Sequence, residues 1–323
     1  MNVWALPRIG SSLLWGTANG IRRCFFKNNI IKSKRFPFPV ISVGNIEVGG
    51  TGKTPIVAML ADRAHEAGKR VCIVLRGYSS QWEVSGGVIE PFSPEVDPGL
   101  CGDEAALLHD LAPYAKIVVG SNRVRELTRA SENIDVCFLD DGFQHLQIKR
   151  DLDIVLVTSN TMSDQVFREF SGALKEADLI FWTKGESRVY LPDTAIEVKW
   201  DAEESVKTQL SHKNVVLVCA VGQPQSVETF LKRFSARVVK RFVFEDHHAY
   251  RAKNAEEIWS EVEEGQSLVL TGKDWVKWKR IDPSADAKRQ DGQLIVIEPK
   301  PFFSSEDKKK WEQPFLSVLQ AKV

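Results

Sequence analysis

The chain contains, between residues 40 and 55, the sequence Val40-Ile-Ser-Val-Gly-Asn-Ile-Glu-Val-Gly-Gly-Thr-Gly-Lys-Thr-Pro55. A short apolar run here leads into a glycine-rich turn, and a helical pattern follows over residues 55–67. This order suits a phosphate, because glycines let backbone N–H groups converge on phosphate oxygens and the helix start adds partial positive charge. In such a loop Lys53 reaches the β- and γ-phosphates and the Thr54 hydroxyl holds Mg²⁺. The sequence therefore predicts a nucleotide site.

The loop departs from the strict G-x-x-x-x-G-K-[ST] pattern at one position, since Glu47 stands where the first glycine is usual. Its second half is nevertheless dense in glycine. The alternative is a tight turn between strand and helix that merely exposes a lysine. The predicted nucleotide contacts are Glu47, Val48, Gly49, Gly50, Thr51, Gly52, Lys53 and Thr54.

The length and the composition of the chain limit the classes of protein to which it can belong. With 323 residues the chain is long enough for two domains, and its charged and apolar fractions are those of a soluble globular protein. Its five cysteines are scattered without a C-x-x-C pair, which predicts reduced cytoplasmic thiols and no structural metal site. No apolar run approaches the ~20 residues of a membrane span, and the N-terminal residues lack a secretory signal pattern.

The first 46 residues are basic and contain no aspartate or glutamate. Such a segment favours an anionic partner, either nucleic acid or a membrane surface. Residues 3–26 are predicted to form one or two helical pieces, and their apolar residues gather roughly on one side: Ile9, Leu13, Leu14, Ala18, Ile21 and Phe25. This helix either lies in a membrane interface with its basic side toward lipid phosphates or packs on its own domain. Periodicity does not separate the two.

Apolar strands and helical patterns alternate after the loop, which predicts an α/β fold with a doubly wound parallel sheet of the P-loop NTPase type. Its further strands are expected at residues 70–75, 87–90, 116–120, 135–140, 153–158 and 178–183. Residues 184–212 lose clear periodicity and are interpreted as a linker, beyond which a second, smaller α/β domain begins. The predicted division is an N-terminal membrane-interface helix over 1–30, a P-loop domain over 31–190 and a smaller domain over 191–323.

Polar residues stand where several strands end, and ligands bind at that edge of open α/β sheets. Asp140 and Asp141 follow a buried strand as in a Walker B motif, whose carboxylate contacts Mg²⁺ directly or through water. Gln144 continues the same turn. Arg123 is either a phosphate contact or a solvated arginine. Asp103 begins a helix, where it is either an N-cap or a base toward an acceptor hydroxyl.

The smaller domain carries Asp246-His247-His248 at the end of a strand. Adjacent histidines can ligate a metal, but no further cluster completes a ligand set. A solvated polar turn is one alternative. The other is an Asp-His pair that faces the nucleotide across a cleft and tunes a catalytic carboxylate. Residues 271–274, Thr-Gly-Lys-Asp, have the same strand-end position.

These motifs follow one another in a distinctive order: Gly44-Asn45, Gly49-Gly-Thr-Gly-Lys-Thr-Pro55, Arg76-Gly-Tyr78, Gly102-Asp-Glu104, Val119-Gly120 with Arg123, Asp140-Asp-Gly-Phe-Gln-His145 with Arg150-Asp151, Asp246-His247, and Thr271 with Lys273-Asp274. In this order they closely resemble the tetraacyldisaccharide 4'-kinase family of lipid A biosynthesis. The resemblance extends from residue 1 to about residue 278, and several unlike motifs carry it.

The resemblance implies a role for each matching residue. It makes Lys53 and Thr54 ligands of ATP and Mg²⁺, and Asp103 the catalytic base on the sugar 4'-hydroxyl, supported by His247. It assigns the metal to Asp140 and Asp141 with Thr54 and Glu104, and the nucleotide surroundings to Gln144, His145, Arg123 and Arg168. The chain departs from the family in lacking a Leu-Pro-Ala-Gly-Pro-Leu run before Arg168-Glu169, in Glu47, where the family commonly has threonine, and in Gly272, where glutamate is usual.

The expected activity is transfer of the ATP γ-phosphoryl group to the 4'-hydroxyl of tetraacyldisaccharide 1-phosphate. Such an enzyme would be peripheral on the cytoplasmic face of the inner membrane, with ATP and Mg²⁺ as cofactors. Nucleic acid and an obligate protein partner are not expected. The alternative is a P-loop switch NTPase that regulates or delivers a protein partner, because the glycine-rich loop suits both.

Overall fold

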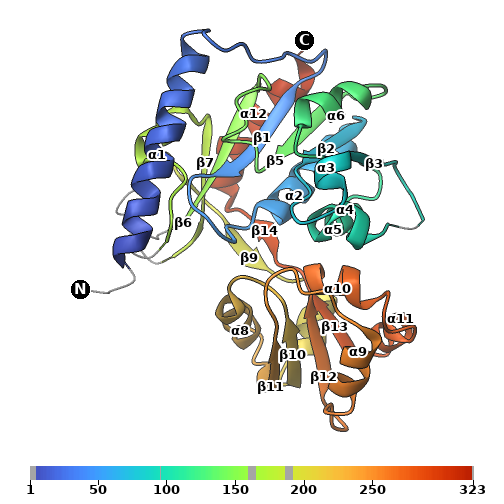
Figure 1. The fold of residues 1–323 in the computed structure, drawn as a ribbon. Coiled ribbons are helices and arrows are strands. Elements are labelled where there is room, and N and C mark those ends of the chain that lie inside the picture. The colour runs from blue at the N-terminus through green and yellow to red at the C-terminus, as the bar shows by residue number, and fades with distance from the viewer. Residues whose placement is uncertain (1–4, 95, 159–164, 186–191, 322–323) are drawn as a thin grey trace.

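The computed structural model describes residues 5–94, 96–158, 165–185 and 192–321, and it contains a larger and a smaller sheet with their helices (Figure 1). In the described residues the larger sheet has eight strands, in the spatial order β3 (Gly87–Ile89), β4 (Lys116–Val119), β2 (Val71–Leu75), β5 (Val136–Asp140), β1 (Val40–Asn45), β6 (Leu152–Thr158), β7 (Leu179–Lys184) and β8 (Ile196–Glu197). The pairs are parallel except β3, which runs antiparallel to β4. The predicted parallel α/β sheet is confirmed.

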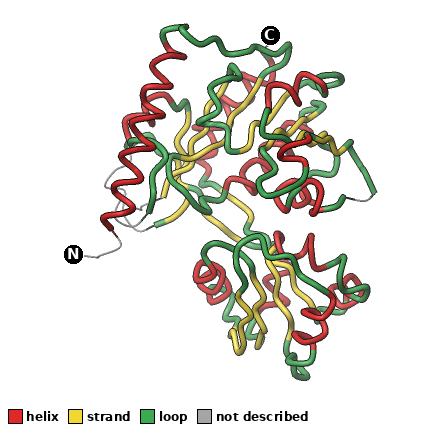
Figure 2. Tube along the Cα trace, viewed as in Figure 1, coloured by secondary structure: helices red, strands yellow, loops and turns green. Residues whose placement is uncertain are grey.

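Helices cover both faces of this sheet, as the ribbon and the tube show (Figures 1 and 2). On one face lie α2 (Lys53–Glu66), α5 (Asp103–Leu111) and α12 (Ser305–Gln320). On the other lie α6 (Arg123–Arg129) and the 3₁₀ turn η1 (Ser171–Glu176). The central strands β1, β2 and β5 are buried along their whole length, which is why they read as continuous apolar runs rather than alternating ones.

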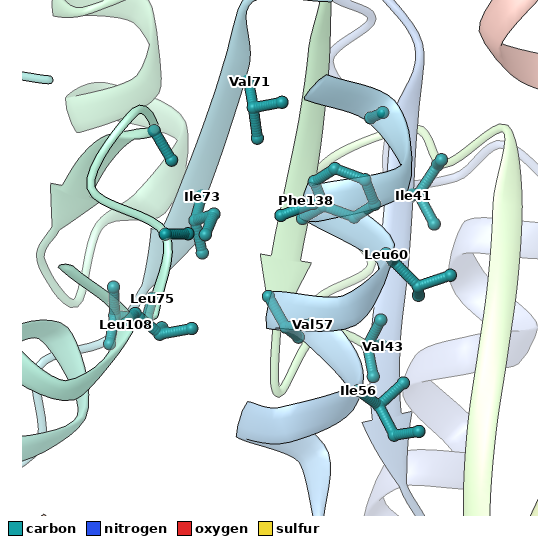
Figure 3. Packing of buried hydrophobic residues seen from close by; sticks show 14 of the residues in the cluster. Ile41, Val43, Ile56, Val57, Leu60, Val71, Ile73, Leu75, Leu108 and Phe138 are labelled. Atoms are coloured by element: carbon teal, nitrogen blue, oxygen red, sulfur yellow. The ribbon is translucent and has the colours of Figure 1, made fainter. Parts of the chain in front are cut away.

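The main core lies between the sheet and α2. Figure 3 shows Ile56 and Leu60 of the helix beside Ile41 and Val43 of β1, with Phe138 of β5 next to them. All five side chains are fully buried. Because α2 starts directly after the glycine-rich loop, this packing also fixes the direction in which the loop leaves the sheet.

The long connection from β2 to α5 contains secondary structure of its own. It contains the short helices α3 (Trp82–Ser85) and α4 (Pro98–Cys101), with the predicted minor strand β3 between them. Gly102 then adopts φ +94, a left-handed conformation that glycine tolerates, and turns the chain into α5.

The smaller sheet is fully parallel, with the order β11 (Arg237–Val243), β10 (Asn214–Cys219), β12 (Ser267–Thr271) and β13 (Leu294–Ile297). Its helices are α7 (Glu204–Leu210), α8 (Pro224–Lys232), α9 (Ala252–Trp259), α10 (Gly272–Trp278) and α11 (Ala285–Gln290). An antiparallel ribbon of β9 (Lys199–Asp201) and β14 (Lys300–Phe302) joins the two sheets (Figure 1). The segment interpreted as a linker thus contains β8, β9 and α7, and β9 makes the connection.

The C-terminal helix α12 lies with the larger sheet, although the sequence interpretation placed residues 191–323 together in the smaller domain. Its side chains Trp311, Phe315 and Leu319 belong to the main core. The Phe315 ring lies 6.3 Å from that of Phe138 on β5, and Trp311 meets Phe181 on β7 edge-on at 6.4 Å. The sequence of this segment does not say which sheet the helix covers.

The N-terminal segment forms one continuous helix, α1 (Ala5–Lys27), along the β6–β7 side of the larger sheet (Figure 1). Val3 and Trp4, which the prediction included, lie outside the described residues. None of the helices in the described part of the chain has the length and apolar content that a membrane span requires.

Truncating the buried face of α12 should destabilise the larger core. We expect Trp311→Ala and Phe315→Ala each to lower the free energy of unfolding by about 3–5 kcal/mol, because each removes a large, fully enclosed ring. Urea denaturation of the purified protein measures this. Lys309→Ala on the exposed side of the same helix is the matched control, and a loss below about 1 kcal/mol for both aromatic variants would contradict the placement of α12.

Candidate active site

The turn between β1 and α2 has the backbone of a phosphate-binding loop. Gly52 adopts φ +86, and α2 begins at Lys53 directly after it. A β-carbon at Gly52 would also lie 2.6 Å from the Trp200 ring, so both the backbone angle and the space require glycine. The first N–H groups of a helix have no partner within it, and here the first residues of α2, Lys53 and Thr54, line a cleft. The loop therefore presents donors and a lysine at one point.

Glu47, which is predicted to contact the nucleotide, braces the loop. Its side chain is buried, and its carboxylate accepts the Thr158 backbone N–H at 2.8 Å and the Thr158 hydroxyl at 2.7 Å. On the same side, Lys184 Nζ donates to the Gly50 carbonyl at 2.7 Å. The glutamate that replaces the usual glycine thus ties the loop to the end of β6. Sequence position alone gave no sign of this contact.

Asp140 and Asp141 lie at the end of β5, next to the loop. Burial, and then the negative charge of Glu104, raise the pKa of Asp140 to about 7. Burial alone would also raise the pKa of Asp141, but the positive charges of Lys53 and Arg168 outweigh it and hold that pKa well below the ordinary value. Lys53 Nζ lies 3.5 Å from the Asp141 carboxylate and Arg168 Nη1 lies 2.7 Å from it. Two adjacent carboxylates therefore differ in protonation.

Three further predicted residues surround this acidic turn. Arg123 is buried and donates to the Asp141 carbonyl at 3.0 Å, and burial lowers its pKa. The side chain of Gln144 donates to the Asn45 carbonyl at 2.8 Å, which links the acidic turn to β1. Burial, followed by the charge of Arg123, lowers the pKa of His145 to about 3, so this imidazole is neutral at physiological pH. Arg123 is thus not the solvated arginine that its position also allowed.

Asp103 receives two partners from the smaller domain. The His247 Nδ1 atom lies 3.3 Å from Asp103 Oδ2, and the Lys277 ammonium lies 3.0 Å from the same oxygen. Burial would raise the pKa of Asp103, but the hydrogen bond from His247 and the charge of Lys277 hold it below its usual range. Gly102, not Asp103, is the N-cap of α5, and the Asp103 side chain makes no capping bond there. The N-cap interpretation of Asp103 is therefore wrong.

Lys277 and Lys273 are the site residues that sequence reasoning missed or left without a role. Lys273 Nζ lies 3.0 Å from the Glu104 carboxylate, as Lys277 does from Asp103. The two lysines are four residues apart on α10 and Asp103 and Glu104 are adjacent on α5, so one helix face meets one helix end. The i, i+4 spacing was visible in the sequence, but nothing local indicated which acids would face it.

A cleft of about 1750 Å³ between the two domains collects the predicted site. It is lined by Val48, Gly49, Gly50, Thr51, Gly52, Lys53, Thr54, Glu104, Arg123, Asp140, Asp141, Gln144, His145, Arg168 and His247. Glu47 instead lines a smaller neighbouring cavity, and Asp103 lies behind His247 with 12% of its side chain exposed. The predicted residues are therefore brought to one place, with the loop and the acidic turn on one wall and His247 on the other.

The oxygen ligands near Lys53 are of the type that hard divalent cations prefer. Asp140, Asp141 and Glu104 repel one another, since Glu104 and Asp141 both raise the pKa of Asp140. No three acidic, histidine or cysteine side chains of the described residues converge closely enough to form a ready-made metal cage. Mg²⁺ does not need one, because it is usually bound by one or two carboxylates together with phosphate oxygens and waters.

Known proteins resemble this chain over most of its length. A family model described as tetraacyldisaccharide-1-P 4'-kinase matches residues 6–319. The tetraacyldisaccharide 4'-kinase of Haemophilus influenzae is 30% identical over 290 residues, covering 85% of this chain and 83% of its own. That of Francisella tularensis subsp. novicida is 32% identical over 281 residues, covering 78% and 84%.

A solved structure has the same fold. The crystal structure of the "apo" form of LpxK from Aquifex aeolicus in complex with ATP matches with a TM-score of 0.75 at 24% sequence identity, covering 98% of this chain and 99% of that one. The two-sheet architecture is thus that of a P-loop kinase fold, and the resemblance inferred from the ordered motifs is confirmed. The chain belongs to the tetraacyldisaccharide 4'-kinase family.

Proposed function

We propose that this kinase transfers the γ-phosphoryl group of ATP to the 4'-hydroxyl of tetraacyldisaccharide 1-phosphate, with the residues of the interdomain cleft in the roles given below. The observation that carries the proposal is the pairing of Asp103 with His247 and Lys277 across the cleft from Lys53. A switch NTPase needs the loop and the acidic turn, but it has no use for a buried carboxylate held by a histidine of a second domain. The switch alternative is therefore not favoured.

The phosphate chain would lie in the loop of residues 48–54. The backbone N–H groups at the start of α2 and the Lys53 ammonium would neutralise the negative charge of the phosphates, because a helix N-terminus carries partial positive charge and binds anions. The Aquifex aeolicus relative was crystallised with ATP, which supports the same ligand here. Arg168, which pairs with Asp141, would exchange that partner for a phosphate oxygen.

Mg²⁺ fits the residues that remain. Burial, and then the negative charges of its acidic neighbours, raise the pKa of Asp140, and a cation would relieve that repulsion. Thr54, Asp140 and Asp141 would hold the ion, with Glu104 behind them. When bound, it would neutralise charge on the phosphate oxygens.

The residues of this chain then divide the phosphoryl transfer between them. The acceptor hydroxyl oxygen forms a bond to the γ-phosphorus, the bond from that phosphorus to the β–γ bridging oxygen breaks, and ADP leaves. The hydroxyl proton passes to the Asp103–His247 pair, whose carboxylate is ionised at neutral pH. Lys53 and Arg168 stabilise the charge that develops on the transferring group. The main contribution of the protein to this reaction is to position the phosphate and the acceptor hydroxyl, which needs residues from both walls of the cleft.

The outer face of α1 is suited to a membrane surface, where the acyl chains of the acceptor would reside. Leu14, Ile21 and Phe25 lie on one side of the helix with 76%, 54% and 42% of their surface exposed. Residues 1–46 contain no acids to repel anionic lipid, and each basic residue near such a surface contributes about 1 kcal/mol. The protein would thus be peripheral on the cytoplasmic face of the inner membrane.

Removing the carboxylate of Asp103 should abolish transfer without abolishing nucleotide binding. For Asp103→Asn we expect phosphorylation of the disaccharide lipid to fall by at least about 10²-fold, while the Kd for Mg·ADP changes by less than about threefold. Radiolabelled γ-phosphate transfer and titration calorimetry measure the two quantities. Asp110→Asn is the matched control, because Asp110 lies on the same helix and pairs with Lys279 near the surface. Normal turnover in Asp103→Asn would reject the assignment.

The protonation of Asp140 should appear in the pH dependence of metal-assisted binding. Below its pKa of about 7 a proton must leave before the carboxylate can ligate, so Mg²⁺ should strengthen nucleotide binding about tenfold less at pH 6 than at pH 8. Calorimetry with and without Mg²⁺ measures this. The nucleotide itself also titrates in this pH range, and this affects the Asp140→Asn protein equally. The pH profile of Asp140→Asn is therefore subtracted from that of the unaltered protein. Identical profiles for the two proteins would remove Asp140 from the metal site.

The exposed face of α1 should govern attachment to lipid. We expect Leu14→Ser combined with Ile21→Ser to reduce sedimentation with anionic vesicles several-fold, because both side chains would leave the apolar interface. The control pair Val84→Ser and Phe92→Ser removes equally exposed apolar residues elsewhere on the larger domain. Equal loss in both pairs, or loss in neither, would show that α1 is not the membrane surface.

A further inference from the structure

Helix α1 turns a row of small and polar residues toward the protein and several large apolar side chains outward. Ser12, Gly16, Asn19 and Arg23 follow one another at helical spacing and lie on the inner side, where Ser12 and Arg23 are 0% and 6% exposed. Leu14, Ile21 and Phe25 occupy the opposite side. An ordinary amphipathic helix packed on a domain has the reverse arrangement. The inner side therefore has a purpose that hydrophobic packing does not explain.

The inner side binds the backbone of residues 167 and 168. The Ser12 hydroxyl accepts the Phe167 N–H at 2.9 Å, and the Asn19 amide donates to the Arg168 carbonyl at 2.8 Å. A β-carbon at Gly16 would lie 2.8 Å from the Phe170 ring, so the helix comes as close to this segment as glycine allows. Three successive turns of α1 thus follow one short segment.

Arg23 fastens the same segment to the acidic turn. Its guanidinium donates to both carboxylate oxygens of Glu169 and reaches Glu176 at 3.0 Å. It also donates to the Phe143 carbonyl at 3.0 Å and lies 4.1 Å above the Phe143 ring. Neighbouring Arg22 donates to the Gln144 carbonyl at 2.9 Å. A buried arginine whose three guanidinium nitrogens are all hydrogen-bonded fixes the separation of the two loops, because its planar fork allows little displacement.

The two segments joined in this way are those that meet at the phosphate site. Arg168 reaches from one to the Asp141 carboxylate of the other at 2.7 Å. The opposite edge of the Arg168 segment is held by β1 and the loop, through Arg168 N–H to the Ile46 carbonyl at 2.7 Å and Val48 N–H to the Val166 carbonyl at 2.8 Å. Arg168 therefore sits on a short strip of backbone clamped between the phosphate-binding loop and α1.

We propose that the inner face of α1 is part of the nucleotide site, and that Asn19 and Arg23 are positioning residues that set the place of Arg168 against the terminal phosphate. This inference rests on the proposed role of Arg168 in binding ATP. It makes α1 more than a detachable anchor, since one helix carries the exposed apolar face on one side and the support of Arg168 on the other. Disturbing the inner face weakens nucleotide binding even when no membrane is present.

A double-mutant cycle on detergent-solubilised full-length protein tests this, with the Kd for Mg·ATPγS as the readout. We expect Asn19→Ala to weaken binding about three- to tenfold, and Arg168→Ala to weaken it more. In the Arg168→Ala background, Asn19→Ala should have no further effect, because its contribution passes through Arg168. Asn28→Ala, just beyond the end of α1, removes an exposed bond to the Cys24 carbonyl and is the matched control.

Arg23→Gln is the second arm, and thermal unfolding shows whether each variant is folded. If the folded Arg23→Gln protein behaves as Asn19→Ala does, the inference is supported. Two results would overturn it. One is that the change in Kd caused by Asn19→Ala or Arg23→Gln multiplies with the change caused by Arg168→Ala. The other is an unchanged Kd in the folded Asn19→Ala and Arg23→Gln proteins. The cycle needs no lipid acceptor, so it tests the inference separately from the proposed acceptor. If the effects of Asn19→Ala and Arg168→Ala do not multiply, but the protein phosphorylates no disaccharide, the proposed acceptor is refuted and the inference stands. Failure of the unaltered protein to bind ATPγS would remove both.

Discussion

Two neighbouring parallel strands impose the constraint on which the site depends. Strands β1 and β5 pair with Val43 opposite Asp140, so the phosphate-binding loop and the acidic turn leave the sheet at the same edge. This brings carboxylates beside a site meant for an anion. The conflict is resolved by charge, because Lys53, Arg123 and Arg168 surround Asp141 while Asp140, deeper and beside Glu104, has a raised pKa. The backbone ladder determines where these groups meet, and their electrostatics determines which of them are charged.

The second wall of the cleft supplies what the sheet edge lacks. Helix α10 of the smaller domain faces α5 of the larger one through Lys273 with Glu104, Lys277 with Asp103, and Lys279 with Asp110. His247 adds a hydrogen bond to Asp103 from the same side. The pKa of Asp103 is therefore lowered by residues of a domain that contains none of the phosphate-binding loop. Without this second wall, Asp103 would lose both His247 and Lys277 as partners.

The orientation of α1 is also determined by a charged group, Arg23. Burying Arg23 is expensive unless every donor is matched, and here Glu169, Glu176 and the Phe143 carbonyl match it. With its polar side committed inward, the helix leaves Leu14, Ile21 and Phe25 to the exterior. The exposed apolar face and the contacts to the Arg168 segment are thus two consequences of one helix rotation. The periodicity that left packing and membrane binding as alternatives is compatible with both at once.

The sequence by itself determined the parts that depend on neighbouring residues: the strand, glycine loop and helix of residues 40–67, the strand ending in Asp140-Asp141, the alternation that predicts a parallel sheet, and the ordered motifs that identify the family. These signals are local, because backbone preference and hydrophobic period are set within one element. The gathering of these motifs into a site could be expected only from the rule that ligands bind at the carboxyl edge of such sheets.

Tertiary structure alone decided the pairings between distant elements. It paired Glu47 with Thr158, joined Lys277 to Asp103, placed α12 on the larger sheet and turned Arg23 inward. Each outcome depends on which surfaces come together once the sheets are formed. An apolar stripe predicts that a helix face will be buried, and a buried charge predicts a pairing with an opposite charge, but neither pattern identifies the partner residue. That choice belongs to the packing of the whole chain.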